Sequence, residues 1–429
     1  MAGASIGNVL EWYDFGIYAF FAVIISRTIF GSSSVSALLL TFLAYGLGFI
    51  FRPLGSIFFG WYGDLKGRKS ALLLTFWIMG IGTILTGIIP PFVLIGIGAP
   101  ILITIARLVQ GFGAGGEWGG AGVYLTELGG KNKRGIYGSL QQEFVLGSVL
   151  IAIISALIID TFPNSFVYSI GWRIPFIVGG ILIIPLAYYL RRKMPETEYF
   201  EQVKKDKKLA VNPIKKAFTK DIKPMLIVLF GTAAVTAQFY VLVTYMSSYV
   251  ATYTHLGLMF GLIISATIEA FMMPSILIFG YLSDKWKTRK KLFWIGTLVL
   301  GLIVYPEFLL IRSGDIVLII AISIILGVLE GIGAGTLVAF IGEQFPTNDR
   351  YSGYIGYNLA ASYFGGFGPF ISMALILMLN NTMAPALWVI AVTIMSLIIL
   401  LFSKETAHID TLPEDVSLYE RRMSETTMK

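Results

Sequence analysis

The stretch Gly60-Trp61-Tyr62-Gly63-Asp64-Leu65-Lys66-Gly67-Arg68-Lys69 decides the fold of this chain. It lies between two long apolar runs, so two helical spans must be joined by a very short, cationic turn. Gly60 and Gly63 allow two helix backbones to approach closely, and Gly67 permits turn conformations that are closed to other residues. A simple cationic stop between spans is the alternative, but it needs neither these glycines nor Asp64. The stretch therefore predicts a specialised turn at a membrane edge.

The composition is that of a polytopic membrane protein. Of the 429 residues, 56% are hydrophobic and only 13% are charged, a balance that a soluble protein of this size does not need. The two histidines are too few for a histidine-based metal site, and the lack of cysteine excludes disulfides and thiol chemistry. The net charge of +7 is concentrated in particular loops and does not indicate nucleic-acid binding. Met1 leads directly into a span that carries Glu11 and Asp14, so no cleavable signal peptide is expected.

Twelve membrane spans are predicted, because each needs roughly 20 apolar residues. They cover residues 5–30, 36–62, 71–90, 99–127, 136–160, 173–191, 224–250, 258–282, 291–311, 315–341, 352–379 and 385–402. Alternate connections are strongly cationic, at Lys66 to Lys69, Lys131 to Arg134, Arg191 to Lys223, Lys285 to Lys291, and Arg350. The remaining connections hold only Arg27, Arg173, Arg312 and His255. By the positive-inside rule the cationic set faces the cytoplasm, and both termini lie there too.

The chain is predicted to be an internal duplication. Residues 1–191 and 224–402 form two six-helix lobes, residues 192–223 a cytoplasmic linker, and residues 403–429 a polar cytoplasmic tail. Three matches between the halves are Gly60-x-x-x-Asp64 with Gly280-x-x-x-Asp284, Gln110-Gly111-Phe112-Gly113-Ala114-Gly115 with Glu330-Gly331-Ile332-Gly333-Ala334-Gly335, and Glu127 with Arg134 against Glu343 with Arg350. They occur in the same order at nearly one offset, the pattern of two lobes related by an axis along the membrane normal.

Ionisable residues inside the spans indicate function. They are Glu11, Asp14, Arg52, Arg107, Glu117, Glu143, Glu269 and Glu330. Because a charge near the bilayer centre costs at least about 2.5–3.5 kcal/mol, each should face a cavity or a partner. At about 1.5 Å rise per residue, Asp14 and Arg107 reach similar heights.

Asp14 and Arg107 are therefore the predicted proton-coupling pair, in which protonation of Asp14 releases Arg107 to help bind an anionic group. A permanent ion pair that fixes the helices is the alternative. Glu11 and Glu117 are further candidates for proton coupling, and they form a second predicted cluster with Arg52. That cluster is a gate in one interpretation and a set of mutually neutralising charges in the other.

With the duplication, the chain resembles the major facilitator superfamily over nearly its whole length. The loop signature of that family is Gly-x-x-x-Asp-(Arg/Lys)-x-Gly-Arg-(Arg/Lys), from which this chain departs at Leu65. Finer motifs are Gly7-Asn8-x-x-Glu11-Trp12-Tyr13-Asp14-Phe15, Arg52-Pro53-Leu54-Gly55, Arg107-x-x-Gln110-Gly111-x-Gly113-x-Gly115-Gly116-Glu117, Gly171-Trp172-Arg173-Ile174-Pro175-Phe176 and Glu343-x-Phe345-Pro346-Thr347-x-x-Arg350. Together they look like the metabolite:proton symporter branch, close to the sugar porters.

The resemblance implies an all-α fold of twelve transmembrane helices in two pseudo-symmetric six-helix lobes, with spans 1, 4, 7 and 10 lining the pore. Members of the branch that this chain resembles carry α-ketoglutarate, citrate, other di- and tricarboxylates, shikimate, proline or betaine. The resemblance therefore does not select the substrate. Related sugar porters have an Asp in span 1 and an Arg in span 4 at these motif positions, which supports the Asp14–Arg107 hypothesis.

Two further sets of residues are predicted to act in the site. The substrate-binding candidates are Arg107, Tyr18, Gln141, Gln142, Gln238, Tyr240, Glu330, Tyr357 and Asn358, with ordinary helix packing as the alternative. The gating candidates are Gly60, Asp64, Arg68, Lys69, Glu127, Arg134, Asp284, Glu343 and Arg350. The gating set is predicted to form an inter-lobe latch in the outward-open state, which biases a two-state equilibrium; simple topology signals are the alternative.

The sequence thus predicts a proton-coupled transporter that imports a small polar metabolite, an organic acid or a zwitterion, by alternating access. A sugar or polyol porter or facilitator is the alternative; a drug efflux antiporter and a non-transporting receptor are less favoured. Antiporters of the family that this chain resembles typically have a Gly-rich, Pro-containing stretch in span 5. The stretch Gly147-Ser148-Val149-Leu150-Ile151-Ala152 has one Gly and no Pro, which argues against an antiporter. No nucleophile elbow, phosphate loop or metal-ligand spacing indicates an enzyme. We expect no cofactor or metal besides transported protons, and a monomer in the cytoplasmic membrane.

Overall fold

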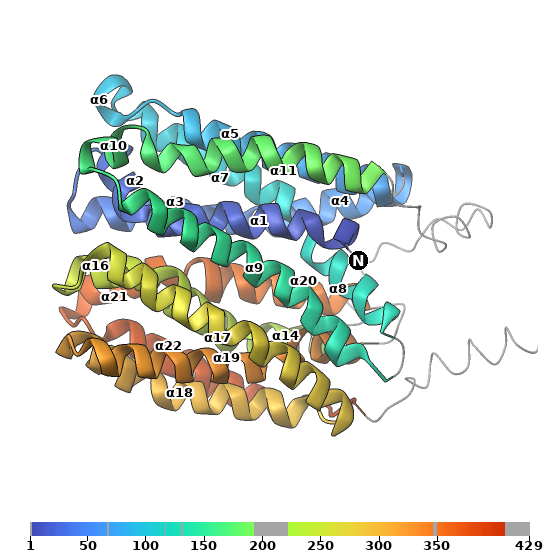
Figure 1. Cartoon of the computed structure of the whole chain (residues 1–429). Coiled ribbons are helices and arrows are strands. Elements are labelled where there is room, and N and C mark those ends of the chain that lie inside the picture. Colours follow the sequence, from blue (N-terminus) through green and yellow to red (C-terminus); the bar gives the residue numbers. More distant parts are fainter. Residues whose placement is uncertain are drawn as a thin grey trace, which may run out of the picture.

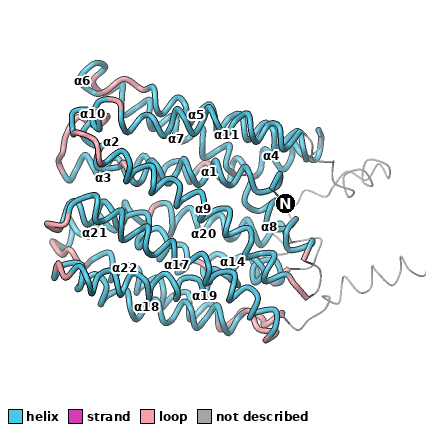
Figure 2. The backbone as a smooth tube through the Cα atoms, in the orientation of Figure 1, coloured by secondary structure: helices cyan, strands magenta, loops and turns pink. Residues whose placement is uncertain are grey.

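The computed structural model describes residues 2–66, 68–115, 117–129, 132–192, 222–345 and 350–407, and within these ranges every regular element is a helix (Figure 2). The first half contains α1 (Ala2–Phe20), α2 (Ala22–Thr28), α3 (Val35–Ile50), α4 (Arg52–Lys66), α5 (Arg68–Ile88), α6 (Phe92–Ile95), α7 (Gly98–Ala114), α8 (Glu117–Leu128), α9 (Arg134–Asp160), α10 (Asn164–Ser169), η1 (Gly171–Arg173) and α11 (Ile174–Arg192). The second half contains α14 (Ile222–Gly231), α15 (Ala233–Phe239), η2 (Tyr240–Tyr245), α16 (Met246–Tyr253), α17 (Gly257–Lys285), α18 (Lys290–Ser313), α19 (Ile316–Glu343), α20 (Arg350–Ala360), η4 (Ala361–Gly366), α21 (Gly368–Leu379) and α22 (Ala384–Leu400).

These elements make twelve spans, as predicted. In the described residues, eight helices are long and apolar enough to cross a membrane, and α1 with α2 makes one further, bent span. Three shorter apolar helices, Leu73–Ile88, Gly171–Leu182 and Ala384–Leu400, complete the set. The helices form two bundles that lie side by side, most of α1 to α11 above and α14 to α22 below in Figure 1, and α9 runs diagonally across the boundary between them. Nearly all of the predicted linker and most of the predicted tail fall outside the described residues, so those boundaries stay predictions.

Local sequence explains several helix ends. The side chain of Ser34 accepts the backbone N–H of Ala37 at the start of α3, and Asp315 accepts that of Leu318 at the start of α19. Gly314 ends α18 at φ 75°, a conformation that glycine adopts at no steric cost.

Close helix crossings explain the repeated glycines. A Cβ atom on Gly111 of α7 would lie 1.6 Å from the carbonyl oxygen of Gly48 on α3. At the corresponding position of the second half, a Cβ atom on Gly331 of α19 would lie 2.3 Å from the Cβ of Ser275 on α17. Only glycine fits at either crossing, because small residues let helix backbones approach closely. The duplication in the sequence is therefore a duplication of helix crossings.

Three spans are interrupted near the middle of the bundle. Span 1 bends by 65° between α1 and α2, at Phe21. Spans 7 and 11 contain the π-helical segments η2 and η4, and such segments occur frequently at functional sites. Within η4, the hydroxyl of Ser362 shares its proton between the carbonyl oxygen of Asn358 (2.7 Å) and that of Phe49 in the other lobe (3.1 Å). Polar side chains of this kind satisfy backbone groups where a membrane helix is irregular.

Candidate functional site

The structure brings Asp14 of α1 and Arg107 of α7 into direct contact. Nη1 of Arg107 donates to one carboxylate oxygen of Asp14 at 2.8 Å, and Nη2 donates to the other at 3.3 Å. Nη2 also donates to the hydroxyl of Thr86 on α5 at 2.9 Å, and the guanidinium lies 4.6 Å from the ring centre of Tyr18. Both charged side chains are almost fully buried. The pair can hold α1 and α7 together while it is ionised, and it would release the guanidinium if Asp14 took a proton.

The second predicted cluster contains a direct ion pair between Arg52 and Glu11. Nη1 of Arg52 lies 2.7 Å from a carboxylate oxygen of Glu11, and its guanidinium lies 4.2 Å from the ring centre of Phe49. The Nε and Nη2 atoms of Arg52 are buried without a hydrogen-bond partner. Glu117 accepts a short hydrogen bond from the hydroxyl of Thr75. Arg52 is therefore a buried cation with two unpartnered donor atoms. The sequence analysis, which grouped Arg52 with two glutamates, did not indicate unpartnered donors.

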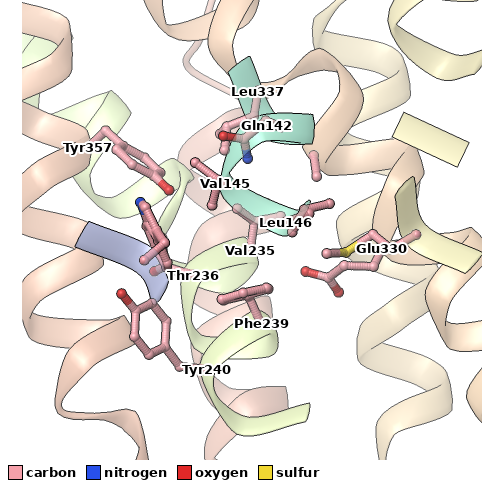
Figure 3. A pocket seen from close by; sticks show the side chains of 13 residues that line it. Gln142, Val145, Leu146, Val235, Thr236, Phe239, Tyr240, Glu330, Leu337 and Tyr357 are labelled. Carbon is pink, nitrogen blue, oxygen red and sulfur yellow. The ribbon is translucent and has the colours of Figure 1, made fainter. Parts of the chain in front are cut away.

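A cavity of about 30 Å³ lies between the lobes (Figure 3). It is lined by Trp12, Gln142, Val145, Leu146, Val235, Thr236, Phe239, Tyr240, Met272, Glu330, Ala334, Leu337 and Tyr357. Figure 3 shows Tyr240 and Tyr357 on one side of the cavity and Glu330 on the other. Since one water needs about 10–15 Å³ by this measure, the cavity has room for water but not for a metabolite. The structure is therefore a closed conformation.

Some predicted binding residues line the cavity and others do not. Gln142, Tyr240, Glu330 and Tyr357 line it. The other candidates are not among its lining residues and have bonds elsewhere: Arg107 with Asp14, Tyr18 with the carbonyl of Thr41, Gln141 with the carbonyl of Trp118, Gln238 with Thr393, and Asn358 through its carbonyl with Ser362. Their roles in binding stay predictions.

Sequence reasoning missed two groups of residues. Trp12 and Phe239 line the cavity with their rings 5.8 Å apart, and Trp12 lies 5.9 Å from Tyr240. No sequence signal separates these rings from packing, because aromatic residues are 14% of the chain. Glu307 of α18 is fully buried. It lies within a predicted span, so the argument from intramembrane charge should have included it.

A polar network joins the lobes at the end of the bundle that carries the N-terminus, which we call the inner end (Figure 1). The carboxylate of Asp284, in the second lobe, accepts the backbone N–H groups of Gly135 and Ile136 at the start of α9, both at 2.9 Å. It also accepts Nη2 of Arg289 at 2.5 Å, and Nε of Arg289 donates to Glu343 at 3.3 Å. Three gating candidates thus belong to one network, since Arg134 reaches Glu343 at 3.9 Å.

Arg289 is the residue of this network that the sequence analysis did not include. It lies five residues after Asp284, which matches Asp64 of the loop signature in the first half. Burial lowers the pKa of Arg289, but the carboxylates of Glu343 and Asp284 outweigh burial and hold it above its usual value. The other gating candidates, Gly60, Asp64, Arg68, Lys69, Glu127 and Arg350, lie outside the residues whose surroundings the structure describes.

The lobes also meet away from the inner end. Trp118 stacks on Tyr357 with ring centres 3.9 Å apart. Nearer the opposite, outer end, the rings of Phe42 and Tyr245 lie 5.5 Å apart. Contacts on both sides of the cavity explain why it is closed.

Comparisons with known proteins agree with one another. Residues 1–222 match the family model described as "Sugar (and other) transporter". The chain is 33% identical over 423 residues to the proline/betaine transporter of Escherichia coli K12, which covers 95% of this chain and 83% of that protein. It is 32% identical over 385 residues to the citrate-proton symporter of Klebsiella pneumoniae, with 89% and 86% covered. A solved D-xylose-proton symporter superposes with a TM-score of 0.72 at 16% identity, over 96% of this chain and 98% of that one.

Proposed function

The chain belongs to the sugar (and other) transporter family of the major facilitator superfamily, and we propose that it imports a small zwitterion with a substituted ammonium group, such as betaine or proline, together with protons. The observation that carries this proposal is the lining of the central cavity. Four aromatic rings and one carboxylate surround it: Trp12, Phe239, Tyr240, Tyr357 and Glu330.

The aromatic lining suits a cationic head group. Quaternary ammonium groups bind against the faces of Trp and Tyr rings, where the attraction reaches about 2 kcal/mol once the site is dry. Glu330 is the only charged side chain among the described lining residues, so the cavity carries no cation of its own. An ammonium group is therefore favoured there over a carboxylate.

Arg52 would bind the other end of a zwitterion. It lies 5.9 Å from the ring centre of Trp12, and its charge acts on Tyr240 and Tyr357, so it lies just behind the first-lobe side of the cavity. Its unpaired Nε and Nη2 atoms are the donors that a carboxylate requires. Arg52 and Glu330 would then hold opposite ends of a bound betaine from opposite lobes when the cavity widens.

Import of a di- or tricarboxylate is the second candidate. It is supported by the printed name of the Klebsiella pneumoniae relative. It requires Arg107 to bind substrate, and both terminal nitrogens of Arg107 are bonded here to Asp14 and Thr86, which leaves only Nε without a partner. Protonation of Asp14 would free it. The sugar or polyol alternative draws only on distant structural likeness.

Proton coupling, topology and assembly complete the proposal. Asp14 carries the coupled proton, Arg107 senses its charge, and the inner-end network opens and closes as the lobes rock about the cavity. The protein works as a monomer in the cytoplasmic membrane with both termini in the cytoplasm. It uses protons and its small-molecule substrate, with no resident cofactor.

Uptake into proteoliposomes that contain a pH dye tests the proposal under an inward proton gradient. Betaine, proline, citrate, α-ketoglutarate, shikimate and a hexose are added in turn. We expect internal acidification with betaine or proline, loss of that signal in Trp12→Ala, and its retention in Trp77→Ala, a matched change at a ring that is 43% exposed. Acidification with citrate but not with any zwitterion would favour the second candidate instead.

A further inference from the structure

Three glutamates inside the second lobe are buried without partners. Glu269 of α17 and Glu307 of α18 are 0% exposed, and Glu330 of α19 is 3% exposed. Both carboxyl oxygens of Glu269 and of Glu307, and one of Glu330, have no hydrogen-bond partner. Buried polar groups in proteins are almost always hydrogen-bonded, so this arrangement needs an explanation.

The three carboxyls belong to one electrostatic cluster. The charge of Glu330 acts on both Glu269 and Glu307. The helices that carry them cross closely, because a Cβ atom on Gly327 would lie 2.4 Å from the carbonyl oxygen of Ile268, the residue before Glu269. A Cβ on Gly331, the residue after Glu330, would likewise lie 2.3 Å from α17. Glu269 and Glu330 therefore flank the same tight crossing.

No described cation balances this cluster. Besides the three glutamates, the described ionisable side chains on α17, α18, α19 and the helices packed against them are Glu117, Arg134, Tyr137, Glu143, Asp160, Tyr240, Tyr245, Tyr249, Tyr253, Tyr281, Asp284, Lys285, Lys290, Lys291, Tyr305, Arg312, Glu343, Tyr354 and Tyr357, and Arg289 directly precedes α18. Glu143 acts on Glu269 and so adds a fourth carboxyl. Arg289 and Arg134 belong to the inner-end network, where Arg289 pairs with Asp284 and Glu343, and Arg134 pairs with Glu343. Lys290 donates to the carbonyl oxygens of Leu401 and Ser403, and the side chains of Lys285, Lys291 and Arg312 are exposed.

Protons are the cations that fit this site. Carboxyls that share a buried site cannot all ionise, since desolvation and like charge both disfavour the charged form. A metal ion is a poor alternative, because no group of three or more His, Cys, Asp or Glu side chains in the described residues is placed to hold one.

We propose that Glu269, Glu307 and Glu330 form a proton-binding site in the second lobe, separate from Asp14, that holds two protons among three carboxyls and exchanges them through the central cavity. Glu330 lines the cavity and is the only member with access to water there. The protons lie on Glu269 and Glu307 when an ammonium group rests against Glu330, which is then ionised. When the cavity fills with water, one proton passes from Glu269 or Glu307 to the carboxylate of Glu330 and from there to a water molecule, which becomes hydronium, so the site exchanges protons through Glu330 without losing both at once.

Infrared spectroscopy of the purified full-length protein at neutral pH tests this proposal without any substrate, so its outcome is independent of the proposed transport activity. A protonated carboxyl gives a carbonyl stretching band that a carboxylate lacks. We expect Glu269→Gln and Glu307→Gln each to remove one band, and the remaining bands to shift in D₂O as the protons exchange. Glu405→Gln is the control, because Glu405 accepts hydrogen bonds from Thr288 and from the backbone of Arg289 and is ionised.

Three results would overturn the proposal. The first is a wild-type spectrum without protonated carboxyl bands. The second is bands that survive in both variants. The third is bands that never shift in D₂O, because such protons would be locked in the structure. If a variant fails to fold, titration of the wild-type bands decides the question, since they must disappear only as the pH is raised.

Discussion

The two lobes share a backbone plan but differ in how they treat the buried carboxyls away from the inner end. In the first lobe, Asp14 pairs with Arg107 and Glu11 pairs with Arg52. In the second lobe, Glu269 and Glu307 are equally buried and have no partner. A duplication that was preserved for packing alone would not have produced this contrast, so the lobes divide the work.

One pair of equivalent positions shows the difference most directly. Gln110 and Glu330 stand one residue before the matching glycines Gly111 and Gly331. The side-chain amide of Gln110 donates to Thr83 at 3.1 Å. Glu330 instead lines the cavity with one unpaired oxygen. The side-chain carbonyl oxygen of Gln110 is also buried without a partner. The same backbone position therefore carries a neutral amide bonded inside its own lobe in the first half and an acid that lines the cavity in the second half.

The largest difference between the lobes is expected when one carboxyl group is removed from each of them. Asp14→Asn leaves Arg107 buried without its counter-charge, and loss of one partner of a buried pair costs about 3–5 kcal/mol. Glu269→Gln replaces a neutral acid with a neutral amide of similar volume, which costs about 1 kcal/mol or less. Denaturant unfolding in detergent measures both free energies. We also expect Asp14→Asn to abolish proton-driven accumulation.

The double variant Asp14→Asn with Arg107→Gln is the control for this prediction. It removes both charges and should recover most of the stability that the single variant loses, but not the accumulation. Equal losses of stability in Asp14→Asn and Glu269→Gln would mean that the two lobes do not differ. Unchanged proton-driven accumulation in Asp14→Asn would show that Asp14 is not the proton carrier.

The shared backbone plan is tested at the two crossings. In Gly111→Ala the new methyl group would lie 1.6 Å from a backbone oxygen of α3, so the helices must separate. We expect a loss of about 3 kcal/mol, the upper part of the range for overpacking. In Gly331→Ala the methyl group meets the side chain of Ser275, and the loss should be of similar size. Gly147→Ala, whose Cβ would approach no atom closer than 4.0 Å, is the control. A tolerated Gly111→Ala would contradict the packing argument.

A substitution in the inner-end network, where the lobes meet, should have a smaller effect, which concerns the balance between the inner-closed and inner-open states. Asp284→Asn loses the charge that Arg289 and the start of α9 share, and hydrogen bonds to charged groups contribute about 2 kcal/mol. At 1.4 kcal/mol per tenfold change, the inner-closed population should fall about 30-fold relative to the inner-open one. Spin labels on α9 and α18 would measure the distance between the lobes. Asp315→Asn at the outer end keeps its capping role and should leave that distance unchanged.

Much of this arrangement was predictable because membranes restrict the choices. Spans must be helical and apolar, so their number and the duplication follow from the sequence. Asp14 and Arg107 could be paired from helical rise alone. The bend at Phe21 and the π-helical segment at Tyr240 could not be predicted, because no proline or glycine marks either one.

The cavity also escaped prediction. Its aromatic lining has the same composition as the surrounding packing, and its position depends on how the two lobes meet. Arg52 was assigned to a charge cluster, and only its unpaired donors in the structure suggest a further role. Side-chain direction at a helix interface is a tertiary property that hydropathy does not encode.

The smallest effect that sharpens the contrast concerns Glu405, a carboxyl of the second half that lies outside the spans and does have partners. Partial burial raises the pKa of Glu405, but hydrogen bonds from the backbone N–H of Arg289 and from Thr288 outweigh burial, so the pKa is lowered from its ordinary value of 4.5. A lowered folded-state pKa stabilises the fold above the unfolded-state pKa, and this contribution disappears as the pH falls below 4.5 through the folded-state value. The wild-type protein should therefore be more stable than Glu405→Gln at neutral pH and lose this difference in stability in that acidic window. The difference should be small because the carboxyl group is half-exposed. Unfolding temperatures of both proteins from neutral pH down to pH 3 measure the difference. Parallel curves would show that the partners of Glu405 contribute nothing, and the distinction between partnered and unpartnered carboxyls would then hold only inside the membrane.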